Sequence, residues 1–183
     1  LTLADALREK GAECQFVCRA HEGNLMDHIR SRGYEVHALA MPSANTPFES
    51  DLAHANWLGV DWSTDAKETQ QVTANSKLDW LIGDPYALDH RWESEMRPTY
   101  KRIMVIDDLA DRRHDCDLLL DQNYGSSAER YAGLVLANCK QLHGPEFALL
   151  KLIYAHRRAE QSFRSGKVER VLIYFGGGSD PLD

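Results

Sequence analysis

The sequence predicts an α/β fold in which a Rossmann-like parallel sheet is flanked by helices. Three observations predict it. Short apolar runs alternate with longer amphipathic stretches from the start of the chain, which is the order of a parallel sheet with crossover helices. Gly11 and Gly33 stand where a glycine ends a helix. Apolar residues make up 43% and charged residues 27%, as in ordinary globular proteins.

The first half of the chain opens with a helix. Leu3, Ala4 and Leu7 fall on one face of a helix over residues 1–10. Asn24 is a suitable N-cap for a second helix that continues to residue 32. The other predicted elements are strands at 14–19 and 34–40, a loop at 41–52, a helical stretch with Trp57 and Trp62, and a polar surface helix at 65–77.

The second half is richer in strands, of which residues 102–108 form the clearest. The other predicted elements are a short buried strand at 79–84, a helix at 87–96, strands at 116–121 and 141–144, a charged helix at 155–164, and a final strand at 168–175. A charged helix gives way to a new apolar strand at 165–167. We therefore expect one domain over 1–166 and the first strand and loop of a second domain at 167–183, whose remainder is missing.

Charge and hydropathy exclude several classes of protein. The net charge is −7, and no basic stripe of the kind found in nucleic-acid binders is present. The same acidity argues against docking on anionic membranes, and no apolar run approaches the roughly 20 residues that cross a bilayer. A phosphorylated small molecule stays possible, because backbone amides and helix N-termini bind phosphate without net positive charge.

The four cysteines are Cys14, Cys18, Cys116 and Cys139. Cys14 and Cys18 fall in one predicted strand, about 13 Å apart at ~3.3 Å per residue, which is too far for a disulfide or a shared metal. We interpret all four as ordinary thiols of a reducing cytosol and expect a cytoplasmic protein without a metal.

Candidate site residues follow the strands, because ligands of open parallel sheets bind beyond the carboxyl ends of the strands. Asp84 and Tyr86 follow one predicted strand, and Asp107 and Asp108 end another. Adjacent residues on a strand point to opposite faces, so only one of the two aspartates can face a cleft. The other caps a turn or pairs with a nearby arginine, Arg112 or Arg113.

A glycine turn follows the final predicted strand, with Gly176, Gly177, Gly178, Ser179 and Asp180 in succession. Its amides can bind an anion, and Ser179 and Asp180 can cap a following helix. A plain strand-to-helix turn is the alternative. The turn matches neither the Rossmann fingerprint nor a P-loop.

Three histidines stand in predicted loops or helices: His21, His90 and His114. A lone histidine on a surface helix usually faces solvent, and His21 is the better candidate because it follows a strand. No His-Glu-x-x-His motif, Gly-x-Ser-x-Gly motif or clustered Cys/His metal pattern is present.

Several segments, taken together and in order, resemble one enzyme family. They are Trp57-Leu58-Gly59-Val60, Asp65-Ala66 with Glu68-Thr69, Asp84-Pro85-Tyr86, residues 105–110, residues 116–123, residues 144–150 and residues 174–180. The set resembles the UDP-2,4-diacetamido-2,4,6-trideoxy-β-L-altropyranose hydrolases of pseudaminic acid biosynthesis, over nearly the whole chain. Lys151-Leu152-Ile153-Tyr154 departs from the family pattern, where Arg-Pro-Glu-Phe is usual.

The resemblance implies the N-terminal half of a GT-B-type two-domain fold with its active site between the domains. The implied reaction is metal-independent and cofactor-independent hydrolysis of a UDP-sugar, with inversion at the anomeric carbon. The family's general base is a histidine in a Gly-x-Gly-His-x-x-Arg loop. We expect this loop upstream of Leu1, so none of the eight histidines inherits that role.

By motif position, the resemblance implies catalytic roles for Tyr86 and Asp84. It also implies substrate binding by Asp107, Asn123, Gly176, Gly177, Gly178 and Ser179, with the uridine held by the missing C-terminal domain. Two alternatives stay open: a GT-B glycosyltransferase with a UDP-sugar donor, and a non-catalytic nucleotide-sugar binding module. The residues that flank this chain in its gene would distinguish them.

Overall fold

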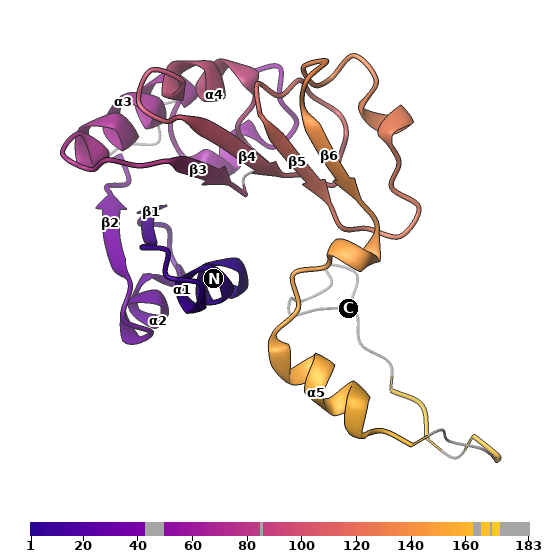
Figure 1. The fold of residues 1–183 in the computed structure, drawn as a ribbon. Coiled ribbons are helices and arrows are strands. Elements are labelled where there is room, and N and C mark those ends of the chain that lie inside the picture. Colours follow the sequence, from indigo (N-terminus) through magenta and orange to yellow (C-terminus); the bar gives the residue numbers. More distant parts are fainter. Residues whose placement is uncertain (43–49, 85, 163–165, 169, 173–183) are drawn as a thin grey trace, which may run out of the picture. The chain divides into compact units, whose positions relative to one another are not determined.

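Two parallel sheets organise the first of the two units into which the chain divides (Figure 1). The computed structural model describes residues 1–42, 50–84, 86–162, 166–168 and 170–172. The first unit is Leu1–Leu150 and the second is Lys151–Asp183. The predicted domain boundary at 166–167 stays a prediction.

The helices of the first unit are α1 (Thr2–Glu9), α2 (Met26–Ser31), α3 (Trp62–Thr73) and α4 (His90–Met96). Its strands are β1 (Gln15–Arg19), β2 (Glu35–Leu39), β3 (Trp80–Gly83), β4 (Arg102–Ile106), β5 (Leu118–Asp121) and β6 (Lys140–His143). The described residues of this unit also form short 3₁₀ turns, η1 (Ala55–Leu58), η2 (Ala128–Tyr131) and η3 (Pro145–Phe147).

Every strand pair among the described residues is parallel. β1 pairs with β2 in one sheet, and the other sheet has the order β3-β4-β5-β6. The prediction of a parallel α/β fold is thus confirmed. All four strands of the larger sheet run the same way. The polar residues that follow β3, β4 and β5 therefore meet at the carboxyl end of that sheet.

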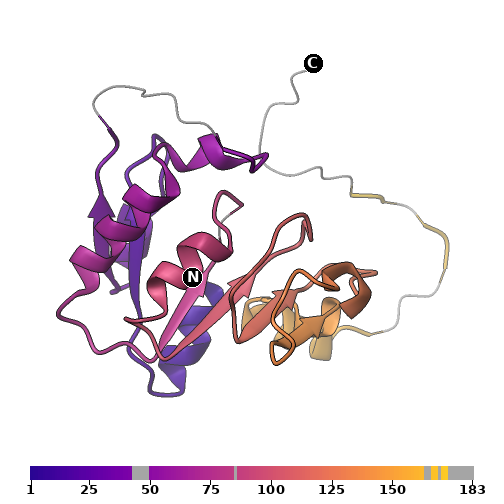
Figure 2. The same cartoon turned by 90° about the horizontal axis from the view of Figure 1, so that it is seen from above.

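The main core lies between the larger sheet and helices α3 and α4, which cover one of its faces (Figure 1). In the view from above, both helices lie nearer to the viewer than the strands (Figure 2). Trp92 and Met96 of α4 pack with Ile103 of β4 and Leu119 of β5, and Met96 and Leu119 are fully buried. The apolar runs that predicted β4 and β5 form the centre of this core.

The helix predicted at 65–77 is formed as α3, but its bounds are shifted to Trp62–Thr73 and one of its faces is buried, not exposed. Helix α3 begins at Trp62, capped by Asp61, whose side chain accepts a hydrogen bond from the Ser63 amide. It has a buried face of Asp65, Ala66, Thr69 and Thr73. Asp65 and Thr73 can line this face because their side chains find partners: Asp65 binds Arg19, and Thr73 Oγ1 accepts a hydrogen bond from the Tyr100 hydroxyl at 3.0 Å.

Strand β3 is not the buried strand that its apolar residues predict. It is an edge strand, because β4 is its one partner among the described strands. Trp80 and Ile82 are consequently 41% and 39% exposed. The guanidinium of Arg102, opposite Trp80 in the ladder, lies 5.5 Å from the centre of the indole ring and covers part of it.

The N-cap of α2 lies one residue after the predicted N-cap, Asn24. Leu25 is the N-cap, and the side chain of Asn24 accepts a hydrogen bond from the Met26 amide at 3.0 Å. Asn24 thus satisfies an amide of the first turn from one position further out.

The second unit contains helix α5 (Leu152–Glu160), which begins three residues before its predicted start at 155 and has no buried residue. The predicted final strand at 168–175 is not formed by the residues described there, Val168, Arg170, Val171 and Leu172. A strand needs a neighbour for its backbone groups, and no strand is described in this unit. Across the described ranges, every helix is too short or too polar to cross a membrane.

Candidate functional site

Polar side chains from three neighbouring strand ends surround a small cavity. Asp84 and Tyr86 follow β3, Asp107 and Asp108 follow β4, and Gln122 follows β5. With Ile106, these residues line a cavity of about 60 Å³. Such a volume accepts a water molecule but not a sugar ring, so a larger ligand would lie over its mouth.

The two adjacent aspartates face different surroundings. Asp107 is 2% exposed and accepts hydrogen bonds from the Ala110 amide at 3.0 Å and the Tyr131 hydroxyl at 3.0 Å. Arg112 forms an ion pair with its other oxygen at 2.9 Å. Burial alone would raise the pKa of Asp107, but the Ala110 amide, Arg112, His114 and Tyr131 together hold the pKa below its ordinary value. Asp107 thus borders the cavity from the protein interior as a fixed charge.

Asp108 is the aspartate with acceptor capacity left over. Its Oδ2 accepts a hydrogen bond from Asn123 Nδ2 at 3.1 Å. Its Oδ1 is buried and has no hydrogen-bond partner among the described residues. A buried carboxylate oxygen without a partner is costly, so a donor from a ligand or a water would be favourable there. The sequence left open which aspartate faces the cavity, and Asp108 was given no role.

Tyr86 and Asp84 both hold their protons more tightly than usual. Burial raises the pKa of Tyr86, and the negative charge of the nearby Asp108 carboxylate raises this pKa further. Burial also raises the pKa of Asp84, and the charge of Asp108 adds to the rise. The Tyr86 phenol therefore stays neutral at physiological pH and can donate a hydrogen bond to a ligand.

An exposed aromatic cluster adjoins these strand ends. It consists of His54, Trp57 and Tyr86, with ring centres 4.3 Å apart for His54 and Trp57 and 6.0 Å apart for each of the other two pairs. Trp57 is 62% exposed and Tyr86 is 42% exposed. Aromatic faces of this kind stack on nucleobases, and they also accept the C–H face of a sugar. The sequence gave Trp57 a place in a motif but no role.

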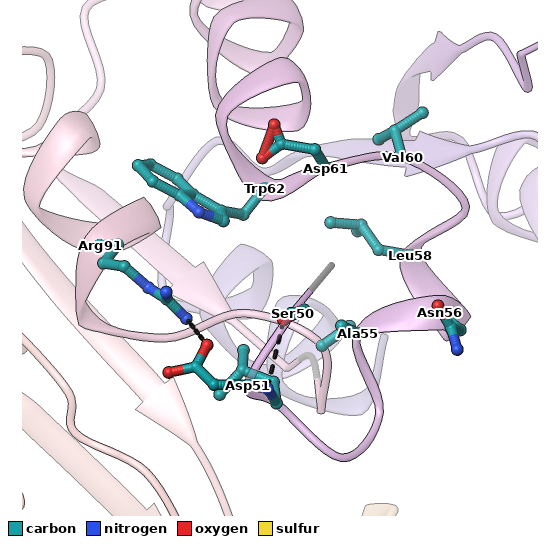
Figure 3. Close-up of a pocket in the computed structure, with 11 residues that line it drawn as sticks. Ser50, Asp51, Ala55, Asn56, Leu58, Val60, Asp61, Trp62 and Arg91 are labelled. Atoms are coloured by element: carbon teal, nitrogen blue, oxygen red, sulfur yellow. Dashed lines mark hydrogen bonds and ion pairs between the residues drawn. The ribbon is translucent and has the colours of Figure 1, made fainter. Parts of the chain in front are cut away.

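A larger hollow of about 920 Å³ lies between the segment 50–62 and α4 (Figure 3). Arg91 reaches across it to Asp51, with 2.7 Å between Nη2 and Oδ1, and its guanidinium lies 5.8 Å from the Trp62 ring centre. Asp89 also pairs with Arg91, at 2.8 Å. Because two carboxylates neutralise the guanidinium, this hollow is poorly suited to bind a phosphate through Arg91.

None of the three candidate histidines is among the residues that line the small cavity. His21 lies against Gly59, close enough that a Cβ there would stand 3.2 Å from its Cε1. His90 begins α4 beside Asp89. His114 is buried, not solvent-facing, and its Nδ1 lies 2.7 Å from Glu93 Oε1. Its partner Glu93 belongs to α4, outside the sequence around His114. The local sequence therefore does not predict that this ring is buried.

Comparisons with known proteins do not assign the chain to a family. The chain matches no protein-family model, and no curated protein matches its sequence. The resemblance therefore rests on the order of the motifs alone. Within these motifs, several polar residues make structural contacts. Asp65 and Glu68 both bind Arg19, and Asp117 accepts hydrogen bonds from the Ile103 amide and from Arg97.

The remaining predicted site residues have different outcomes. Asn123 is exposed at the cavity rim and bonds to Asp108. Gly176, Gly177, Gly178 and Ser179 lie outside the described residues. In the described part of the chain, no group of three or more His, Cys, Asp or Glu is arranged to hold a metal ion.

Proposed function

We propose that the polar strand ends and the aromatic cluster form one wall of a sugar-nucleotide site, in the N-terminal half of a GT-B-type enzyme. The enzyme hydrolyses a UDP-linked 2,4-diacetamido-2,4,6-trideoxy sugar to UDP and the free sugar. One observation carries the proposal: acceptors, a phenol and an exposed indole converge at the carboxyl ends of neighbouring parallel strands. This is the place where open α/β sheets bind ligands.

The wall offers complementary contacts for an acetamido sugar. Asp108 Oδ1, buried and without a partner among the described residues, would accept a hydrogen bond from a hydroxyl or amide N–H of the sugar. The neutral Tyr86 phenol would donate one. The exposed Trp57 face would cover the C–H face of the ring or an acetamido methyl group. Asp107, fixed in its ion pair with Arg112, would keep the strand end in shape.

An inverting hydrolysis needs a base for the attacking water on one face of the sugar and stabilisation of the departing diphosphate on the other. In this proposal, a histidine encoded upstream of Leu1 is the base, and the amides of Gly176, Gly177 and Gly178 contact the diphosphate. Tyr86 and Asp84 act next to the anomeric carbon. Closure of the two domains would exclude competing water from the site.

The decisive experiment measures UDP release by the full-length gene product. We expect the UDP-linked diacetamido sugar to give UDP and free sugar without any acceptor and with EDTA present. The anomer formed first, followed by NMR, should be inverted. Turnover only after an acceptor is added would overturn the hydrolase and establish a glycosyltransferase. Binding of the sugar nucleotide without turnover would instead establish a binding module.

The chain by itself provides a second test. Residues 1–183 should release no UDP and should bind UDP too weakly for a clear calorimetric titration, because the proposed uridine site belongs to another domain. Micromolar binding of UDP by this chain would contradict that assignment.

A further inference from the structure

Two thiols that are far apart in the sequence lie in contact at the start of neighbouring strands. Cys116 Sγ and Cys139 Sγ are 3.6 Å apart. Cys116 stands two residues before β5, and Cys139 stands directly before β6. The register of the sheet fixes their proximity, since Leu118 pairs with Lys140 in the parallel ladder.

The contact is close to the geometry of a disulfide. A disulfide joins its sulfurs at about 2.05 Å, so the two atoms would have to approach by about 1.5 Å from their separation of 3.6 Å. Neighbouring strands lie about 4.8 Å apart, and disulfides usually join Cα atoms separated by roughly 4.4–6.8 Å. Rotation of the two side chains and a small movement of the strand ends can supply the approach.

The two thiols are unequal. Cys116 is fully buried in the main core, whereas Cys139 is partly exposed. The contact between them lowers the pKa of Cys139 and raises the pKa of Cys116. Cys139 is consequently the thiol that solvent reaches and that more readily becomes a thiolate, the reactive form of cysteine.

We propose that Cys116 and Cys139 form a redox-modification site, which a peroxide oxidises to an intramolecular disulfide. In the first step, the Cys139 thiolate attacks one peroxide oxygen and becomes a sulfenic acid, while the O–O bond breaks and hydroxide leaves. In the second step, Cys116 sulfur attacks the sulfenic sulfur. The S–O bond breaks, and the departing hydroxide takes the Cys116 proton to form water. The two thiols lose two electrons in all, and the peroxide accepts them.

The chain carries its own control in Cys14 and Cys18. The structure describes all four cysteines as free. Cys14 Sγ faces the Ala4 carbonyl oxygen at 3.9 Å, and burial raises the pKa of Cys18. These two thiols therefore lack the contact that makes Cys139 reactive and that supplies a second sulfur. The inference does not depend on the proposed function.

The test treats the folded chain with hydrogen peroxide, blocks the remaining thiols with N-ethylmaleimide, and maps tryptic peptides without reduction. Cleavage after Arg113, Arg130 and Lys140 places Cys116 in the peptide 114–130 and Cys139 in the peptide 131–140. We expect these two peptides joined, with a mass two hydrogens below their sum. The free-thiol titre should fall from four to two per chain, and dithiothreitol should restore it.

Variants make the test specific. In Cys116→Ser, Cys139 should progress to the sulfinic acid because no resolving thiol is present. In Cys139→Ser, the buried Cys116 should stay reduced, and this exposed-site variant is the safer one for folding. Oxidation of wild-type Cys139 to the sulfinic acid without joined peptides would overturn the proposal. So would equal joining of Cys14 or Cys18, or equal joining of Cys116 and Cys139 after unfolding in urea.

Discussion

The guanidinium of Arg19, at the end of β1, donates two hydrogen bonds of 2.7 and 3.2 Å to one carboxylate oxygen of Asp65 in α3. The other oxygen of Asp65 accepts a hydrogen bond of 2.9 Å from the Trp92 indole in α4. Both members of the ion pair are buried. One carboxylate thus links the two-stranded sheet to the helices that cover the four-stranded sheet.

Asp65→Asn should strongly destabilise the chain. The substitution removes one of the two carboxylates that neutralise the buried Arg19 guanidinium, while Glu68 stays paired with it at 2.7 Å. The loss should therefore be large but below the roughly 3–5 kcal/mol of a buried charge left without any partner. Urea unfolding followed by circular dichroism would measure the loss. Asp27→Asn is the matched control, because the Asp27 side chain is 99% exposed in its pair with Arg30. Equal stability of the two variants would show that the Arg19–Asp65 pair is not needed.

Asp107 should make the chain sensitive to acid. Its pKa is lowered in the folded state, whereas an unfolded aspartate titrates near a pKa of about 3.9. The contribution of Asp107 to the free energy of unfolding is therefore complete above about pH 4. It is lost as the pH falls toward the lower pKa of the folded state. Asp107→Asn should be less stable than the wild type at pH 7 but should lose less stability between pH 5 and pH 3. If the stability of the wild type and of Asp107→Asn changed with pH in the same way, Asp107 would not be the cause of the acid sensitivity.

Gly59→Ala should cost more than Gly133→Ala. Both glycines have positive φ, of +81° and +76°, so both substitutions force alanine into the left-handed region at about 1–2 kcal/mol. At Gly59 a Cβ would also stand 2.7 Å from Met41 Cε and 3.2 Å from His21 Cε1, whereas at Gly133 nothing lies within 4 Å. Because both variants share the cost of positive φ, the difference between their melting temperatures measures the effect of crowding at Gly59. Equal melting temperatures would show that Met41 moves aside freely.

Tyr86→Phe should lower the turnover number of the full-length protein about tenfold, the equivalent of one lost hydrogen bond. Stability should change little, because Tyr86 is 42% exposed. Tyr124→Phe, at a side chain that is 95% exposed, serves as the control for removing a phenol. Steady-state kinetics of both variants provide the measurement. An unchanged rate in Tyr86→Phe would leave the phenol a packing role only.

The sequence predicted the strands better than the surroundings of their side chains. Runs such as residues 102–106 have the apolar composition of a central strand, and tertiary contacts do not change that assignment. The burial of α3 could not be predicted, because Asp65 is polar and its partner Arg19 lies 46 residues away. A charged residue in a helix is predicted to be exposed unless the residue that neutralises its charge is already known.

The candidate site was predicted by position but not in detail. The rule for strand ends selected Asp84, Tyr86 and Asp107, and alternation predicted that only one residue of the aspartate pair could face a cleft. Both aspartates border the small cavity, but only one of them keeps a buried oxygen without a partner among the described residues. Which one it is depends on Tyr131 and Arg112, which hold Asp107 inside. The contact of Cys116 with Cys139 depends on the pairing of β5 with β6, and no local pattern fixes that register.

The exposed edge of β3 has a consequence for self-association. Among the described strands β3 has no second partner, so the backbone donors and acceptors of this edge are a template for another strand. Trp80 and Ile82 add an apolar surface to it. The Arg102 guanidinium over the Trp80 ring is a positive charge at this edge. A second copy that approached with its own β3 would bring another arginine and be repelled, whereas a strand with a carboxylate at that position would be accepted. We therefore expect the Arg102 charge to oppose pairing of two copies through their β3 edges.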